Sequence, residues 1–342
     1  MTDNERIDPS VDRVDVAVLG GGAAGLSAAL VLGEALRSVV VIDNGAPRNA
    51  PATHIHGYLT RDATSPAEFL DAGRAQARAV GARFLDAAVD SVEQVGESAD
   101  CGPAFDVRLR DGAMVRARRV LVATGLVDAF DSEIAGVAEQ WGRGVAHCPY
   151  CHGYEVRGSA IAVLSTDTAR GVHQALLLRQ WSEDVTLFIH SGDDPDEVSA
   201  ERLAARGVDV VAGPVERLEQ AGDAVTGVVL ASGERYPAES VFVGAMLRAE
   251  PNDAVLTALG AETRGTPFGP FVKVDSMTFA TSVPGVYAAG NVVDPSAQVI
   301  VSAAAGYRAA AMLNFDLVEE DTDAAVEEAR RSSGTRRAEK AG

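Results

Sequence analysis

The alternation of apolar and polar residues near the start of the chain predicts a strand, a glycine-rich turn, an alanine-rich helix and a second strand. This stretch reads VDVAVLGGGAAGLSAALVLGEALRSVVVIDNG, and the second strand covers residues 38–42 and ends at Asp43. Short apolar runs on both sides of a helical segment are typical of a βαβ unit in a parallel sheet. We therefore expect the chain to open with half of a doubly wound α/β fold.

A second βαβ unit begins near residue 159, with a helix over residues 172–181 and a strand over residues 185–190. Because 342 residues are long for one compact domain, two lobes are expected. The first lobe is predicted to comprise residues 1–126 and 247–318, and the second residues 127–246. Residues 319–342 are predicted to form a charged tail that is either a loose helix or disordered. The other predicted elements are a helix over 66–79, short antiparallel strands over 84–118 with a break at 101–103, strands over 119–125 and 283–290, several strands over 208–244, and a helix over 298–315.

Composition and charge exclude several classes of protein. Hydrophobic residues make up 47% of the chain and the net charge is −19, so a globular protein that does not bind nucleic acid or an anionic membrane surface is expected. The polar start is not typical of a signal peptide, and the first apolar run is interrupted by glycine and is not expected to span a membrane. With three cysteines, a disulfide framework of the secreted kind is excluded, and a cytoplasmic protein is expected.

The turn GGGAAG satisfies the GxGxxG pattern in the context that makes this pattern informative. Gly20 permits the tight turn, Gly22 lets the backbone approach a pyrophosphate, and Gly25 lets the helix pack close to the strand. The amide groups at the helix start then face the anion. Asp43, at the end of the second strand, is positioned to accept hydrogen bonds from a ribose diol. A dinucleotide site is therefore predicted here.

The second βαβ unit lacks these glycines. Ser165, Asp167 and Arg170 stand roughly where GxGxxG would place them, so the turn cannot give a pyrophosphate its backbone cradle. The segment SGDDPDEV after the next strand is acidic where a 2′-phosphate pocket would need arginine. We expect the architecture to repeat without the nucleotide chemistry.

The segment His147-Cys-Pro-Tyr-Cys-His-Gly153 places Cys148 and Cys151 at the spacing of a reactive dithiol, with a histidine on either side. A neighbouring histidine stabilises a thiolate when protonated and transfers protons when neutral. A zinc site would need about four ligands, and neither a second CxxC nor an HxxxH motif occurs. Zinc binding and an inert reduced pair remain as alternatives to a redox role, and His147 either assists the thiols or packs against its loop.

Together these features resemble the low-molecular-weight thioredoxin reductase family over residues 14–317. The matching segments are GGGAAG with Asp43, the strand end ATG, CPYC, and VYAAGNVVDPSAQVIVSAAAG. The resemblance implies two Rossmann-like lobes of three-layer ββα architecture, a homodimer, and FAD with its diphosphate on the first turn. It also puts Asn291 near the ribityl or phosphate atoms and the helix start at Gln298 against the isoalloxazine. The expected FAD-binding residues are Gly20, Gly22, Ala23, Ala24, Gly25, Asp43, Asn44, Arg48, Asn49, Ala123, Thr124, Gly125, Gly290, Asn291, Gln298 and Val299.

Two departures from that family indicate a sub-group. His152 stands where the family carries an aspartate, and the nucleotide motifs of the second lobe are absent. In this the chain is similar to the FAD-dependent dithiol oxidases that close disulfides in natural products such as holomycin, gliotoxin and romidepsin. The resemblance implies a small dithiol substrate, O2 as acceptor, Cys148 as the exchanging sulfur and Cys151 as the flavin-facing one.

Within this reading we expect His152, with His147, to accept the thiol proton. An NADPH- or ferredoxin-dependent thioredoxin reductase acting on a small redox protein is the alternative, and a non-catalytic FAD-binding redox sensor is a third reading. His54 and His56 either contact the substrate or face solvent.

Overall fold

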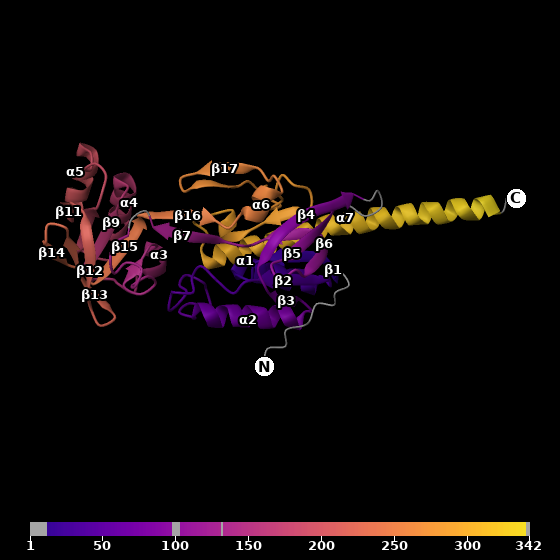
Figure 1. Ribbon diagram of the computed structural model, residues 1–342, viewed down its shortest axis with the longest axis horizontal. Helices are drawn as coiled ribbons and strands as arrows, with labels where there is room; N and C mark the ends of the chain where they lie inside the picture. Colours follow the sequence, from indigo (N-terminus) through magenta and orange to yellow (C-terminus); the bar gives the residue numbers. More distant parts are fainter. Residues whose placement is uncertain (1–11, 98–102, 131–132, 340–342) are drawn as a thin grey trace. The chain divides into compact units, whose positions relative to one another are not determined.

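The structure, a computed structural model, describes residues 12–97, 103–130 and 133–339, so Cys101 lies outside the described residues. The chain divides into two compact units, each with a β-sheet that contains adjacent parallel strands (Figure 1). The first unit comprises Met1–Pro47, Phe69–Val127 and Pro251–Gly342, and the second comprises Arg48–Glu68 and Asp128–Glu250. The expected α/β class with parallel sheets is confirmed.

The unit boundaries differ from the predicted ones mainly at Arg48–Glu68, which the sequence pattern assigns to the first lobe but which packs with the second. This segment has a turn-rich sequence and no periodicity that would reveal its partner. Strands β7 (Leu126–Phe130) and β16 (Leu247–Pro251) pair with each other where the chain passes between the units.

The sheet of the first unit is built around β1, which lies between the parallel strands β2 and β6. The start of β6 also pairs with antiparallel β5, and its end pairs with parallel β19. The strand order is β3-β2-β1-β6-β5-β4, with β19 beside β6. The strands are β1 Asp12–Leu19, β2 Val39–Asp43, β3 Arg83–Asp86, β4 Val89–Glu97, β5 Pro103–Leu109, β6 Met114–Val122 and β19 Val286–Ala288.

Both faces of this sheet are buried, which explains why its central strands are almost continuously apolar. Ala17 and Leu19 of β1 pack with residues of β4 and β5, whereas Val16 and Val18 pack against helices on the opposite face. The first unit therefore consists of two β-layers and one helical layer. The helices are α1 Ala23–Glu34, α2 Pro66–Ala79, α6 Ala254–Ala258 and α7 Val299–Glu339, and a small hairpin is formed by β17 Thr263–Thr266 and β18 Gly269–Val272.

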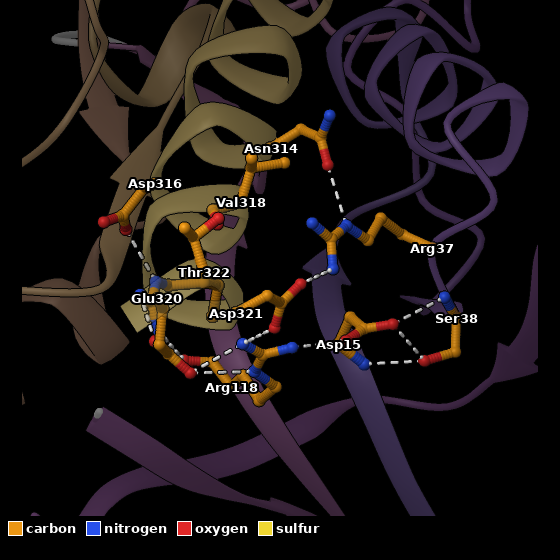
Figure 2. A network of polar contacts seen from close by, with 11 residues as sticks. Asp15, Arg37, Ser38, Arg118, Asn314, Asp316, Val318, Glu320, Asp321 and Thr322 are labelled. Carbon is orange, nitrogen blue, oxygen red and sulfur yellow. Dashed lines mark hydrogen bonds and ion pairs between the residues drawn. The ribbon is translucent and has the colours of Figure 1, made fainter. Parts of the chain in front are cut away.

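Helix α7 is longer than predicted and runs to Glu339, so the charged segment from residue 319 is not a separate tail (Figure 1). Three of its acidic residues, Asp316, Glu320 and Asp321, pair with two neighbouring arginines of β6, and Figure 2 shows the pairs of Arg118. Arg119, only 3% exposed, pairs with Asp316 at 2.7 Å and with Glu320 at 2.6 Å, and Arg118 pairs with Glu320 at 2.7 Å. The segment is therefore helical, as one of its two predicted alternatives has it, and its residues Glu320 and Asp321 are paired with the sheet.

The second unit combines a five-stranded parallel sheet with a three-stranded antiparallel sheet. Its parallel strand order is β11-β10-β9-β15-β8, and α4 covers one face. The elements are β8 Val145–Ala146, α3 Pro149–His152, β9 Ile161–Ser165, α4 Thr168–Leu178, β10 Val185–Ile189, α5 Glu197–Ala205, β11 Val208–Ala212, β12 Val215–Ala221, β13 Ala224–Leu230, β14 Arg235–Pro237 and β15 Ser240–Ala245. Among the described residues of the whole chain, no helix is both long and apolar enough to cross a membrane.

Helices α1 and α7 pack directly against each other, and the closeness of this packing can be tested. A Cβ atom at Gly306 would lie 2.0 Å from the carbonyl oxygen of Ala24. Gly306→Ala should therefore lower the free energy of unfolding by about 1 to 3 kcal/mol, because overpacking outweighs the gain of roughly 1 kcal/mol in helix propensity. The urea midpoint measures this change.

Gly265→Ala is the matched control, since a Cβ atom there meets nothing within 4 Å. A Gly306→Ala protein as stable as the parent chain would contradict the close crossing.

Candidate active site

The GGGAAG turn of the first unit has the geometry of a dinucleotide cradle. Gly20 adopts a φ of +104°, and a Cβ atom there would lie 2.4 Å from the carbonyl oxygen of Ala123. At Gly25 a Cβ atom would lie 1.9 Å from the carbonyl oxygen of Gly20, so the helix start lies tight against the turn. Gly22 is different, because a Cβ atom there meets nothing within 4 Å. The turn is thus packed on its protein side and open at Gly22.

Asp43 ends β2 directly beside this turn. Its Oδ2 atom lies 2.7 Å from the position of a Cβ atom at Gly21 and accepts a 2.8 Å hydrogen bond from Arg74. Arg74 also binds Asp86 and holds the half-buried Asp43 carboxylate in place. Arg74 is on α2, and nothing in its local sequence indicates this role. Asn44 accepts a hydrogen bond from the backbone amide of Ala46 through its own side chain.

The end of β6 is clamped by a residue that the sequence does not single out. The hydroxyl of Thr124 donates to the carbonyl oxygen of Asn252 at 2.6 Å, and the Asn252 amide donates to the carbonyl oxygen of Thr124 at 3.0 Å. Gly125, with a φ of +70°, accepts from the backbone amide of Asn252. The predicted Ala-Thr-Gly strand end is therefore a fixed turn beside Gly20.

The start of α7 adjoins the same turn. Gly290 has a φ of +81°, and a Cβ atom there would lie 3.0 Å from the Cβ of Ala24. The side-chain amide of Asn291 donates two 2.9 Å hydrogen bonds, to the carbonyl oxygens of Asp294 and Ala297. These bonds shape the loop that enters α7, which begins at Val299 directly after Gln298.

Three separate segments of the first unit thus lie around the glycine turn, namely the ends of β2 and β6 and the loop before α7, and their binding of FAD stays a prediction. Two predicted cofactor residues, Arg48 and Asn49, belong instead to the second unit. The Asn49 carbonyl accepts from the amide of Ala52 in its own loop.

The two cysteines of the CPYC segment belong to one short helical turn, α3: Cys148 precedes its first residue and Cys151 lies within it. Cys148 is the N-cap residue, and its carbonyl oxygen accepts from the backbone amides of Cys151 and His152, both at 3.2 Å. Pro149 occupies the first helical position, where a missing amide proton costs nothing. Both cysteines are partly buried thiols rather than a disulfide. Helix α4 holds this segment in place, because its Gln174 side chain donates a 2.7 Å hydrogen bond to the carbonyl oxygen of His147.

His147 is enclosed by groups that make it a weak base. Its ring stacks on Trp141 at 5.6 Å between centroids, and its Nε2 atom lies 3.5 Å from a guanidinium nitrogen of Arg48. Arg48 is itself held by two 2.7 Å hydrogen bonds to Asp128. Burial, together with the Arg48 charge, lowers the pKa of His147 to about 4. This environment favours the packing role that the sequence leaves open for His147.

His152 lines a cavity of about 150 Å³ within the second unit. The same cavity is lined by His54, His56 and Glu155, so the loop of residues 53–56 is not simply solvent-facing. Burial lowers the pKa of His152 from its usual value, although the carboxylate of Glu155 opposes this effect. The Nδ1 atom of His152 is buried and has no hydrogen-bond partner among the described residues. At neutral pH His152 is therefore an uncharged imidazole that can accept a proton.

The turn between β9 and α4 is filled by its own side chains. The hydroxyl of Ser165 donates to the carbonyl oxygen of Asp167 at 2.6 Å, and the Asp167 carboxylate caps α4 by accepting from the amide of Arg170 at 3.1 Å. The Arg170 side chain bonds the carbonyl oxygens of Gly244 and Leu247. The helix-start amide that a phosphate would use is thus bonded to a carboxylate.

Metal ligation has no geometric basis in the residues that the structure describes. No group of three or more His, Cys, Asp and Glu side chains in those ranges is arranged to hold a metal ion.

Known proteins resemble this chain over most of its length. The thioredoxin reductase sirT of Leptosphaeria maculans is 32% identical over 323 residues, which cover 90% of this chain and 95% of sirT. The crystal structure of HlmI aligns with a TM-score of 0.87 and 48% identity, covering 94% of this chain and 97% of HlmI. The crystal structure of an oxidoreductase from Agrobacterium tumefaciens aligns with a TM-score of 0.81 and 32% identity, covering 90% of this chain and 99% of that one.

The pyridine nucleotide-disulphide oxidoreductase family matches residues 14–310, which include the glycine turn, the CPYC segment and the start of α7. This agreement confirms the resemblance to thioredoxin reductases that the sequence motifs predict. The chain therefore belongs to the pyridine nucleotide-disulphide oxidoreductase family and is a thioredoxin reductase-like thiol/disulfide oxidoreductase.

Proposed function

We propose that this enzyme is an FAD-dependent dithiol oxidase that closes a disulfide in a small molecule and passes the electrons to oxygen. One observation carries the proposal. The CPYC turn and its base are intact, whereas the turn of the second unit bonds its own side chains in place of a nucleotide phosphate. This arrangement favours a thiol rather than a pyridine nucleotide as the source of electrons.

FAD fits the first unit. The turn is open at Gly22, the helix-start amides lie beside that opening, and Asp43 offers a fixed carboxylate for a ribose diol. The segments at Thr124 and Gly290 enclose the same turn. When bound, FAD supplies the two-electron acceptor for the reduced cysteine pair and the route to oxygen.

The residues of the second unit account for the exchange step. One thiolate of the substrate attacks Sγ of Cys148, the Cys148–Cys151 disulfide breaks, and Cys151 leaves as a thiolate. The second substrate thiol then attacks the mixed disulfide, which releases Cys148 as a thiolate and closes the substrate disulfide. Each attack requires a deprotonated sulfur, and His152 accepts that proton.

An NADPH- or ferredoxin-dependent thioredoxin reductase is the second candidate, because curated relatives such as sirT carry the name thioredoxin reductase. Its electron source would be NADPH or ferredoxin, and its substrate a small redox protein. The acidic residues Asp193, Asp194 and Asp196 beside the second-unit sheet disfavour a 2′-phosphate. The two candidates are therefore separated by the source of electrons.

Pyridine nucleotides should not reduce the enzyme. Under nitrogen, millimolar NADPH or NADH should leave the FAD absorbance unchanged, because several charge-assisted contacts worth roughly 1.5 to 3 kcal/mol each are missing. A small dithiol added to the same sample should bleach it, and air should restore it with formation of peroxide. Bleaching by micromolar NADPH would support the reductase instead.

The cysteine pair should be essential for turnover and dispensable for the cofactor. Cys148→Ser and Cys151→Ser should each lower dithiol oxidation to background, since neither variant can form the enzyme disulfide. Both should retain FAD, which is measured by absorbance after gel filtration. Cys101→Ser is the matched control and should keep full activity. Undiminished oxidation by either active-site variant would exclude the disulfide exchange.

The two histidines should differ in their effect. His152→Asn should lower kcat/KM by about 10²- to 10⁴-fold, whereas His147→Asn should keep it within about tenfold. Burial depresses the pKa of His152, so its neutral form persists at pH 7 and kcat/KM should fall only as the pH drops below 6.5 through the folded-state pKa. The pH profile of kcat/KM measures this acid-side decrease. A decrease that already begins above pH 7 as the pH is lowered would contradict His152 as the proton acceptor.

A further inference from the structure

His56 lies between two carboxylates from different parts of the second unit. Its Nδ1 atom is 3.6 Å from Oδ2 of Asp62, and its Nε2 atom is 3.5 Å from Oε1 of Glu155. The ring is 17% exposed, while Glu155 is 40% exposed. Both contacts become ion pairs when the ring carries a proton. His56 and Glu155 thus lie side by side on the wall of the His152 cavity, where a protonated His56 ring forms an ion pair with the Glu155 carboxylate.

The loop that carries His56 is fixed by its backbone. The amide of Ile55 donates to the carbonyl oxygen of Thr64 at 2.8 Å, and Ile55 itself is buried at 4% exposure. The amide of Gly57 donates to Oδ1 of Asp62 at 2.9 Å. Asp62 therefore holds both the loop and the ring, so His56 has a defined position rather than that of a mobile surface histidine.

His152 reaches the same cavity from α3. Of the groups there, Glu155 follows α3, His54 and His56 come from the loop, and Arg143 comes from the turn before β8. His147 lies on the other side of the cysteine turn and interacts electrostatically with His152. The charges of Glu155 and His56 act on His152 in opposite directions, the former favouring its protonated form and the latter disfavouring it.

We propose that His56 and Glu155 are positioning residues that control how readily His152 takes and releases the proton of the substrate thiol. The proposal rests on the proposed dithiol oxidation. In that step the S–H bond breaks, the proton passes to the His152 ring, and the sulfur electron pair forms the bond to Cys148 as Cys151 leaves. A base that held the proton too firmly would be blocked before the second thiol reacts. The opposed charges of Glu155 and His56 therefore let His152 both accept the thiol proton and release it again.

This arrangement predicts shifts of opposite sign. His56→Gln removes the cation and leaves Glu155 unpaired beside the cavity, so the pKa of His152 should rise by about 0.5 to 1 unit. Glu155→Gln removes the anion and leaves the His56 charge, so the pKa of His152 should fall by a similar amount. A loss of packing alone would not reverse sign between two partners of one pair.

The test uses the FAD-loaded enzyme and two readouts. The His152 ring is titrated by NMR with labelled histidine, its resonance being assigned from its loss in His152→Asn, and the acid limb of kcat/KM is measured with a small dithiol. His173→Gln on an exposed face of α4 and Glu201→Gln on exposed α5 are matched controls, and both should leave the titration unchanged. Glu155→Gln changes an exposed side chain, so it remains informative even if His56→Gln does not fold.

Opposite shifts in the NMR titration support the inference whether or not dithiol is oxidised. Shifts of the same sign, or none, overturn it even in an enzyme that oxidises dithiols with air. Failure of the proposed function is seen separately, as absence of dithiol-dependent flavin bleaching in the unaltered enzyme.

Discussion

Close backbone approach around Ala24 is the constraint on which the first unit depends. Gly306 lets α7 lie against the carbonyl oxygen of Ala24, Gly290 brings the segment before α7 to its Cβ atom, and Gly25 closes the turn on Gly20. A Cβ atom at each of these glycines would lie 3.0 Å or less from another atom, so α7 and the segment before it are held close against the turn near the start of the chain. Of the four glycines in the turn, only Gly22 has open space at its Cβ position, which is where a ligand phosphate would approach.

In the second unit, the turn of the corresponding βαβ unit does not leave its helix-start amide open to a phosphate. Where the first turn has glycine, Ser165 and Asp167 supply hydroxyl and carboxylate groups that satisfy the helix start internally. Arg170 then links this turn to the end of β15 through the carbonyl oxygen of Gly244. A polar group that is already bonded offers a ligand little net gain, because binding would only exchange one hydrogen bond for another. The turn between β9 and α4 is therefore bonded internally, while α4 supports the CPYC segment through Gln174.

The parts of the fold that the sequence predicts are those encoded by local patterns. The apolar runs, the GGGAAG turn and the CPYC pair lie within short windows, and each is found where its pattern indicates. The pairing of α7 with the sheet is different, because Glu320 binds Arg118 and Arg119, which are about two hundred residues away in sequence. Figure 2 shows the Arg118 contacts. A charged segment viewed alone is equally consistent with a solvated tail. The clamps of Arg74 on Asp43 and of Asn252 on Thr124 also join distant segments and have no local signal.

The two histidines beside the cysteines illustrate how tertiary environment separates identical side chains. From sequence both are candidates for the base, since each is adjacent to a cysteine. In the fold, the accessible nitrogen of His147 meets the Arg48 guanidinium, and protonation there would add a second positive charge in a buried place. His152 is also buried, but it opens on a cavity that contains a carboxylate, and its Nδ1 atom has no partner among the described residues. A proton taken up by His152 is therefore compensated by Glu155, whereas a proton on His147 is opposed by Arg48, and this difference supports the proposal that His152 takes the thiol proton.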